Sequence, residues 1–180
     1  MAQTKQIDKP AYALGLIGLG VMGRSLAQNF ERNGFPVIGY DIATNLPMDF
    51  AVKVTDSVAA LAGALDRPRK ILMMVPAGSP VDTVIASVKP YLQAGDILID
   101  GGNSFFEDTE RRVKSVAQDG LVFVGMGVSG GESGALLGPS LMPGGMRSAW
   151  EPIRPMLEAI SAKAEDGLPC VAWMGGGGAG

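Results

Sequence analysis

Short apolar runs alternate along the chain with segments whose apolar residues recur at helical spacing. The runs predict strands at Tyr12–Ile17, Pro36–Tyr40, Val52–Val54, Lys70–Val75, Ile97–Ile99, Leu121–Gly125 and Val171–Trp173. The helical spacing predicts helices at Gly20–Asn33, Ser57–Leu65, Pro80–Leu92, Phe105–Gln118 and Ala149–Ala162. Continuously apolar runs are typical of a parallel sheet that helices cover on both faces. The alternation therefore predicts an α/β fold with a doubly wound, mainly parallel sheet.

A glycine motif joins the first predicted strand to the first predicted helix, at Gly18–Gly23 with the sequence GLGVMG. The first glycine permits a tight turn, the second lets the backbone approach phosphates, and the third lets helix and strand pack closely. The helix N-terminus supplies unpaired N–H groups and a partial positive charge. We interpret the motif as the pyrophosphate site of a dinucleotide in a Rossmann-type domain; a purely structural glycine turn is the alternative.

The domain organisation follows from the absence of any internal repeat or low-complexity linker between the predicted elements. Residues 1–10 are polar and precede the first predicted strand, so we predict a loose N-terminal lead-in there. We assign residues 11–180 to one Rossmann-type dinucleotide-binding domain.

Asp41 directly follows the second predicted strand, about 20 residues beyond the glycine motif. A carboxylate there accepts hydrogen bonds from the ribose hydroxyls of the adenosine and repels a 2′-phosphate. Ile42 would flank the adenine, and no arginine follows to bind a 2′-phosphate. These residues favour NAD over NADP; a surface turn or helix-capping role for Asp41 is the alternative.

Two further strand exits offer polar groups near the place where ligands bind in such sheets. Asn103 follows two glycines and brings both a donor and an acceptor, whereas we expect Ser104 to cap the next helix. Ser129 precedes Gly130 and Gly131 and offers a hydroxyl and exposed N–H groups to an anionic substrate. No base accompanies Ser129, so we do not interpret it as a nucleophile.

Composition narrows the possible partners. The net charge is −3 and no basic cluster stands out, which argues against nucleic acid. No apolar run is long enough to span a bilayer, so we expect no membrane association. The chain has no histidine and one cysteine, Cys170, which excludes a histidine-based metal site, a thiolate cluster and an internal disulfide and fits a cytoplasmic location.

The motifs together resemble the N-terminal NAD(P)-binding domain of 6-phosphogluconate dehydrogenase, the decarboxylating enzyme of the pentose phosphate pathway. The matching stretches are Gly18–Gly23, Asp100–Ser104, Val128–Glu132, Gly138–Gly145 and Gly178–Gly180. The related 3-hydroxyisobutyrate-type dehydrogenases share the opening turn and the Val-Ser-Gly-Gly element. They are not similar over the second and fourth of these stretches together.

The resemblance implies an oxidoreductase that converts 6-phosphogluconate to ribulose 5-phosphate with NAD(P). With the strand-exit argument, it assigns the cofactor to Gly18, Leu19, Gly20, Val21, Met22, Gly23, Asp41, Ile42, Val75, Ala77 and Asn103. It assigns the substrate to Asn103, Ser129, Gly130 and Gly131.

Two departures from the family pattern concern the cofactor. Familiar NADP-using members carry Asn-Arg-Thr after the second strand, where this chain has Asp41-Ile42-Ala43. Pro76 stands where those members usually carry lysine. Both departures agree with NAD as the preferred cofactor and NADP as the weaker one.

The resemblance also places a general-base lysine, a general-acid glutamate and an all-helical domain beyond Gly180. We therefore expect no catalytic residue in this chain, the absence of the family's C-terminal helical domain, and a longer parent that is a homodimer. The 180-residue chain alone is expected to bind dinucleotide weakly and to be inactive. Two rival interpretations remain: a 3-hydroxyisobutyrate-type 3-hydroxyacid dehydrogenase and a non-catalytic NAD(H)-binding module.

Overall fold

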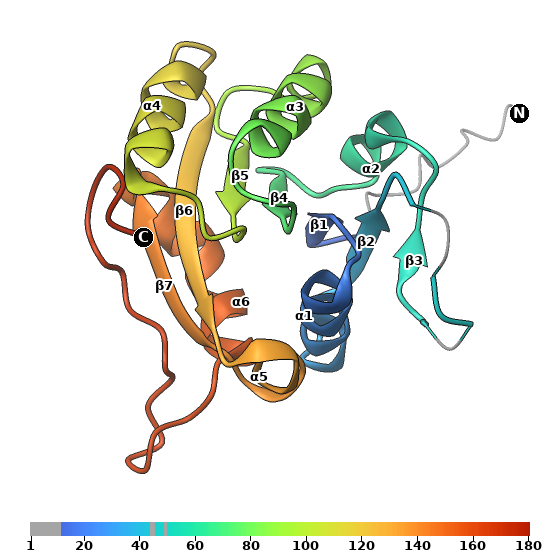
Figure 1. The fold of residues 1–180 in the computed structure, drawn as a ribbon, viewed down its shortest axis with the longest axis vertical. Coiled ribbons are helices and arrows are strands. Elements are labelled where there is room, and N and C mark those ends of the chain that lie inside the picture. The colour runs from blue at the N-terminus through green and yellow to red at the C-terminus, as the bar shows by residue number, and fades with distance from the viewer. Residues whose placement is uncertain (1–11, 44–45, 49) are drawn as a thin grey trace, which may run out of the picture.

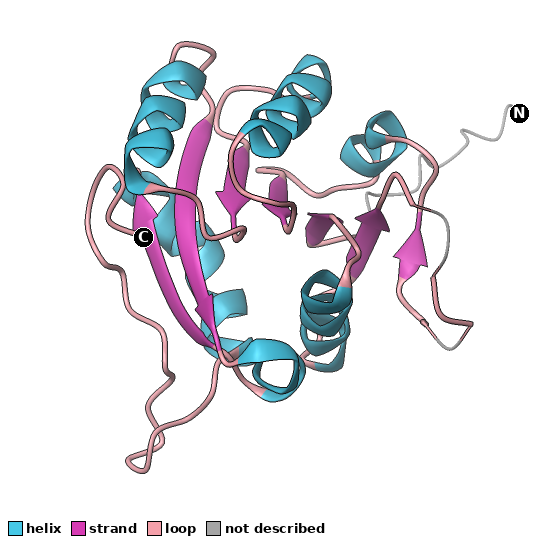
Figure 2. Ribbon diagram, viewed as in Figure 1, coloured by secondary structure: helices cyan, strands magenta, loops and turns pink. Residues whose placement is uncertain are grey.

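The computed structural model describes residues 12–43, 46–48 and 50–180, which fold around one seven-stranded sheet (Figures 1 and 2). The predicted lead-in at residues 1–10 lies outside the described residues. The strands are β1 Leu14–Ile17, β2 Val37–Tyr40, β3 Lys53–Val54, β4 Lys70–Met73, β5 Ile97–Asp100, β6 Val122–Ser129 and β7 Ser140–Gly145. The α-helices are α1 Val21–Arg32, α2 Val58–Gly63, α3 Ser79–Val88, α4 Phe106–Ala117, α5 Gly131–Leu137 and α6 Trp150–Ile160. Two 3₁₀ turns, η1 Lys89–Tyr91 and η2 Arg147–Ala149, complete the elements.

The order of strands across the sheet is β3-β2-β1-β4-β5-β6-β7. Strands β1 to β6 run parallel, and β7 pairs antiparallel to β6. The chain therefore builds outward in one direction from β1 and then returns to build outward from β4. This confirms the doubly wound, mainly parallel sheet and places the topological switch point between β1 and β4.

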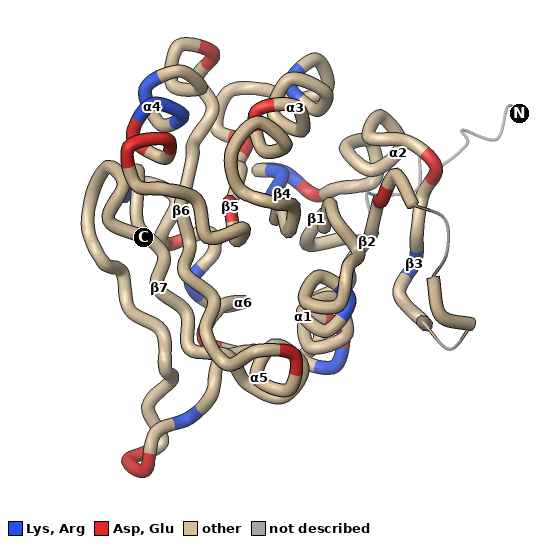
Figure 3. The backbone as a smooth tube through the Cα atoms, in the orientation of Figure 1, with Lys and Arg blue, Asp and Glu red and all other residues tan. Residues whose placement is uncertain are grey.

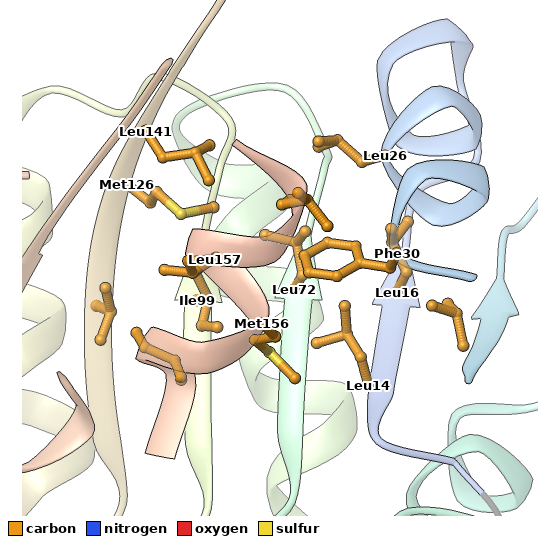
Figure 4. Close-up of a cluster of buried hydrophobic side chains, with 14 of the residues drawn as sticks. Leu14, Leu16, Leu26, Phe30, Leu72, Ile99, Met126, Leu141, Met156 and Leu157 are labelled. Atoms are coloured by element: carbon orange, nitrogen blue, oxygen red, sulfur yellow. The ribbon is translucent and has the colours of Figure 1, made fainter. Parts of the chain in front are cut away.

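Helices cover both faces of the sheet, with α2, α3 and α4 on one side and α1, α5 and α6 on the other (Figure 1). Successive strand residues point to opposite faces. Leu16 packs into the cluster formed with α1 and α6, while the next residue, Ile17, packs with α2, α3 and α4. Figure 4 shows Phe30 of α1 and Leu157 of α6 among the buried side chains that lie over the strands on the first face. The continuous apolar runs are thus explained by burial on both sides.

No strand was predicted at the position of β7. Pro143 and two glycines make it a weak strand former by composition. It forms because β6 continues to Ser129 and offers six residues for pairing, from Val124 opposite Gly145 to Ser129 opposite Ser140. The prediction of a strand at Val171–Trp173 is wrong: this segment makes only an isolated bridge between Leu141 and Val171.

Helix α5 was also missed, since it contains two glycines, which disfavour helix by about 1 kcal/mol each relative to alanine. Its packing against α1 offsets this low propensity. The buried side-chain amide of Asn29 donates to the carbonyl oxygens of Ala135 and Ile160, each at 3.0 Å. Asn29 thereby joins α1 to α5 and to the end of α6.

The residues after α6 run as a long loop whose last part follows the outer edge of β7. The N–H of Gly145 donates to the carbonyl of Gly175, and the N–H of Met174 donates to that of Pro143. The loop ends with Gly180 against Gly125 on β6. In the part of the chain that the structure describes, no helix is both long enough and apolar enough to cross a membrane.

Candidate functional site

A cleft of about 750 Å³ opens at the carboxyl ends of β1, β2 and β4, at the switch point of the sheet. Its floor comes from the glycine turn, one wall from the end of β2, and the other from the β4 exit and α3. The residues predicted for the cofactor that line it are Gly18, Gly20, Asp41, Ile42 and Val75. Other residues of the lining are Ile17, Tyr40, Val58, Met74, Pro76, Ser79, Pro80, Thr83, Val84 and Ser87.

Steric contacts within the protein explain why the first and third positions of the turn are glycine. Gly18 adopts a φ of +95°, and a Cβ there would overlap the carbonyl oxygen of Met74. A Cβ on Gly23 would overlap the carbonyl oxygen of Gly18. The predictions of a tight turn and of close helix–strand packing are therefore confirmed.

Gly20 is different, because the described protein leaves its surroundings open. A Cβ at this position would have no neighbour within 4 Å among the described residues. Its φ of −61° and ψ of −175° suit any residue. Neither packing nor backbone conformation requires glycine at this position on the floor of the cleft. Close approach of a ligand to the backbone is a requirement that glycine would meet.

The amino end of α1 opens at the floor of this cleft. Gly20 is the N-cap, makes no side-chain capping bond, and no acidic residue stands in the first turn. The N-terminal N–H groups and the helix dipole thus favour an anion here. Arg24, which sequence reasoning did not single out, donates from Nη1 to the carbonyl of Leu19 at 2.9 Å and adds a positive charge beside the turn.

Asp41 lies at the end of β2 with its carboxylate against the glycine turn. Oδ2 accepts from the N–H of Leu19 at 2.5 Å, and Oδ1 accepts from the N–H of Ala43 at 2.7 Å. Asp41 therefore does have the turn-stabilising role considered as its alternative. A carboxylate has about four acceptor sites, so these two bonds leave room for ribose hydroxyls.

The other predicted cofactor residues lie around the cleft rather than among its lining residues. The side chain of Leu19 is buried in the core and packs on Gly39, so only its backbone faces the turn. Val21 is half-exposed and Met22 packs partly against the core. Ala77 follows the β4 exit without lining the cleft. Ile42, which does line the cleft, is 90% exposed at its mouth.

Asn103 lines a second, smaller cavity of about 230 Å³, at the end of β5 and beside the middle of β6. Its backbone is left-handed, with φ of +58°, a conformation that asparagine tolerates better than most residues. Asp100, Ser104, Thr109, Gly125, Met126, Gly127 and Gly180 form the rest of the lining. The last residue of the chain thus lies in the same cavity as the predicted bifunctional asparagine.

The prediction that Ser104 caps α4 is wrong. Phe105 holds the N-cap position and makes no side-chain capping bond. The hydroxyl of Ser104 donates instead to Oδ2 of Asp100 at 2.6 Å. Asp100 is buried and accepts a second local bond at Oδ1, from the N–H of Gly102 at 3.0 Å. The carboxylate of Asp100 therefore binds residues on both sides of Asn103 and fixes the turn that carries it.

The predicted substrate residues Ser129, Gly130 and Gly131 lie where β6 ends and α5 begins. Both glycines have positive φ, +127° and +61°, so the backbone bends sharply there. None of the three lines either the cleft or the smaller cavity. The described residues thus do not bring them into one cavity with Asn103.

Arg112 of α4 is a feature of the site region that sequence reasoning missed. Its side chain is 1% exposed and reaches both the β4–α3 and the β5–α4 loops. Hydrogen bonds from Arg112 and Arg111, partly offset by burial, lower the pKa of Asp82 to about 2. Among the described residues, no group of three or more His, Cys, Asp or Glu side chains could hold a metal ion.

Comparison with known proteins identifies the relatives of this site. A sequence model described as the NAD binding domain of 6-phosphogluconate dehydrogenase matches residues 13–175. The chain belongs to this family. The decarboxylating 6-phosphogluconate dehydrogenase of Haemophilus influenzae is 49% identical over 175 residues, which cover 93% of this chain and 36% of that protein. The chain therefore spans about a third of the length of the relatives it matches.

Solved structures agree with this family membership. Plasmodium falciparum 6-phosphogluconate dehydrogenase, described in complex with its cofactor NADP+ and with its substrate 6-phosphogluconate, superimposes with a TM-score of 0.86. It is 36% identical, and the match covers 93% of this chain and 38% of the Plasmodium chain. Mycobacterium tuberculosis 3-hydroxyisobutyrate dehydrogenase gives a TM-score of 0.81 at 25% identity, covering 94% of this chain and 56% of that one. The chain is thus an NAD(P)-binding domain, and its sequence is more similar to the phosphogluconate enzymes than to this 3-hydroxyisobutyrate dehydrogenase.

Proposed function

We propose that this chain is the cofactor-binding domain of an enzyme that oxidatively decarboxylates 6-phosphogluconate to ribulose 5-phosphate, and that it prefers NAD to NADP. The observation that carries the cofactor part is the open position at Gly20, on the floor of the cleft and at the uncapped amino end of α1. A pyrophosphate there would receive N–H groups and a positive helix end.

The residues around the cleft divide into roles by their chemistry. Gly18–Gly23 would hold the pyrophosphate through the backbone, with Arg24 as a nearby positive charge. Asp41 would accept from the adenosine ribose, and Ile42 would flank the adenine. The rest of the cofactor would cross the switch point toward Val75. When bound, the nicotinamide supplies the hydride acceptor for the oxidation.

The preference for NAD rests on charge. A 2′-phosphate on the same ribose would meet the negative charge of the Asp41 carboxylate. Two negative charges about 4 Å apart repel each other by about 1 kcal/mol in water and several-fold more near a protein surface. The Plasmodium relative binds NADP+, so this chain would differ from it in cofactor preference.

The substrate would lie beside Asn103, with Ser129, Gly130 and Gly131 contributing to its binding. Gly180 lines the cavity of Asn103, so residues joined to it in a longer protein would enter the site from that edge. The general-base lysine and general-acid glutamate that the family resemblance implies would come from there. A helical domain beyond them would complete a homodimeric, cytoplasmic enzyme, and the 180-residue chain alone would be inactive.

Parallel titrations of this chain with NADH and NADPH, followed by cofactor fluorescence, test the proposal. We expect saturable binding of NADH and weaker binding of NADPH. Tighter binding of NADPH would contradict the argument from Asp41, and absence of binding by both would contradict the cofactor site itself. Oxidation of 6-phosphogluconate by the chain alone would contradict the expectation that catalytic groups lie outside it.

A further inference from the structure

The guanidinium of Arg112 is buried, and all five of its N–H groups donate hydrogen bonds. Nε donates to Asp82 at 3.0 Å, and Nη2 donates to Asp82 at 3.1 Å and to the carbonyl of Gly78 at 2.8 Å. Nη1 donates to Ser104 at 3.0 Å and to Asp100 at 3.4 Å. An arginine has five donors in a fixed plane, so this residue fills its hydrogen-bonding capacity completely.

The acceptors of these bonds belong to two separate segments of the chain. Gly78 and Asp82 lie in the β4–α3 loop and in α3, whereas Asp100 is the last residue of β5 and Ser104 lies in the loop after it. The side-chain fork from α4 therefore lies between the β4 and β5 exits and holds both (Figure 3 shows the charged residues on α3 and α4). Gly78, whose carbonyl accepts one of these bonds, has a φ of +89°, a conformation that few residues other than glycine adopt.

Each held segment carries a residue of the candidate site. Val75 lines the cleft three residues before Gly78, and Asn103 lies between Asp100 and Ser104. The hydroxyl of Ser104 donates to Asp100 and accepts from Arg112, and Arg112 also donates to Asp100, so the three side chains bind one another beside the Asn103 turn. A change in Arg112 would release both turns together.

The arrangement exceeds what stability alone requires. Burying an ion pair costs desolvation, and apolar residues of similar size often stabilise a fold as well or better. The planar guanidinium of Arg112 instead fixes the distance and orientation between the groups that it binds on the two loops. In the proposed binding mode the adenosine half of a dinucleotide would lie on the β1–β2 side near Asp41, so the two loops held by Arg112 would face the nicotinamide half.

We propose that Arg112 is a positioning residue that fixes the β4 and β5 exits at the spacing the nicotinamide half needs, without touching the cofactor. The inference rests on the proposed dinucleotide function. It predicts that substitution of Arg112 weakens binding of the nicotinamide half of the dinucleotide only. The adenosine half would be held by the glycine turn and Asp41, neither of which Arg112 contacts.

Binding of NADH and of ADP to the same variants provides the test. ADP carries the adenosine and pyrophosphate but no nicotinamide. Arg112→Lys cannot reach five acceptors, and we expect it to weaken NADH binding by about tenfold, as for loss of one or two charged hydrogen bonds. ADP binding should stay within about twofold of the wild type. Arg111→Lys is the control, because Arg111 is exposed and donates only to Asp82 and Asp108.

Ser104→Ala keeps the experiment informative if Arg112→Lys fails to fold. It removes the hydroxyl that links Asp100 to Arg112 and leaves the guanidinium in place. We expect about a threefold loss of NADH affinity and none for ADP. Equal losses for both ligands, or no loss for NADH, would overturn the inference while leaving the cofactor site standing. A wild type that binds neither ligand would overturn the proposed function and the inference together.

Discussion

Asp41 and Leu19, 22 residues apart in sequence, are joined by a 2.5 Å hydrogen bond from the backbone N–H of Leu19 to the Asp41 carboxylate. The bond ties the end of β2 to the glycine turn. The proposed ribose acceptor and the proposed pyrophosphate cradle therefore form one unit, and the carboxylate is held in place before a ligand arrives.

Replacing Asp41 by asparagine should narrow the preference for NADH over NADPH. The amide removes the negative charge that opposes a 2′-phosphate and keeps an oxygen acceptor, so we expect the affinity ratio to fall by about tenfold. Fluorescence titration of both cofactors measures the ratio. Asp166→Asn, in the loop after α6, is the matched control and should leave it unchanged. An unaltered ratio in the Asp41 variant would show that this carboxylate does not set cofactor choice.

Gly20→Val should separate ligand binding from folding. The described protein leaves room for a side chain at Gly20, so we expect the free energy of unfolding to change by about 1 kcal/mol or less. Branched carbons on the floor of the cleft would block the pyrophosphate, and NADH affinity should drop by roughly tenfold or more. Urea denaturation and NADH titration on one sample supply both quantities.

Gly63→Val is the control for this experiment. A Cβ at Gly63 also has no neighbour within 4 Å among the described residues, but the position lies at the end of α2 away from the turn. Its NADH affinity should match the wild type. Undiminished NADH binding by the Gly20 variant would place the pyrophosphate elsewhere.

Gly23→Ala should act in the opposite way, through the fold. The new Cβ would overlap the carbonyl oxygen of Gly18, so α1 and β1 must shift apart at a cost of about 1–3 kcal/mol. The midpoint of urea unfolding reports this cost. Gly63→Ala, in the open surroundings of α2, should instead stabilise by up to about 1 kcal/mol. Equal effects of the two alanines would mean that Gly23 is not a packing requirement.

The first six strands, the mainly parallel sheet and the location of the cleft could be predicted from the sequence because the signals are local. Apolar runs buried on both faces and a glycine turn between strand and helix each occupy only a few residues. Strand β7 and helix α5 could not be predicted in this way. Both are rich in glycine, and both form because of contacts with another element, β6 for the strand and Asn29 of α1 for the helix.

The sequence signal for the role of Arg112 is weaker. It stands with Thr109, Val113 and Val116 on the face of α4 that packs inward, so a charged residue occupies an otherwise apolar helical stripe. Such a residue predicts a buried partner without saying where it is. The five acceptors come from Gly78, Asp82, Asp100 and Ser104, and only the folded sheet brings these segments together.

Stability at acid pH should depend on Asp82. Its pKa of about 2 lies below the ordinary value of 3.8, chiefly because Arg112 donates hydrogen bonds to it. The carboxylate therefore contributes its stabilisation above about pH 4, and that contribution is lost as the pH falls toward 2. Asp82→Asn removes the titration. We expect urea midpoints measured from pH 4 to pH 2.5 to fall less steeply in the variant than in the wild type, and parallel curves would contradict this assignment.

Backbone amide NMR of the uniformly labelled chain during NADH addition tests the central claim most directly. If the dinucleotide rests on the amino end of α1, the amides of Gly18–Gly23 should shift most and saturate with a single dissociation constant, and the amide of Ala43 beside Asp41 should follow the same curve. Saturable binding with shifts confined to other segments, such as α4 or the loop after α6, would contradict it.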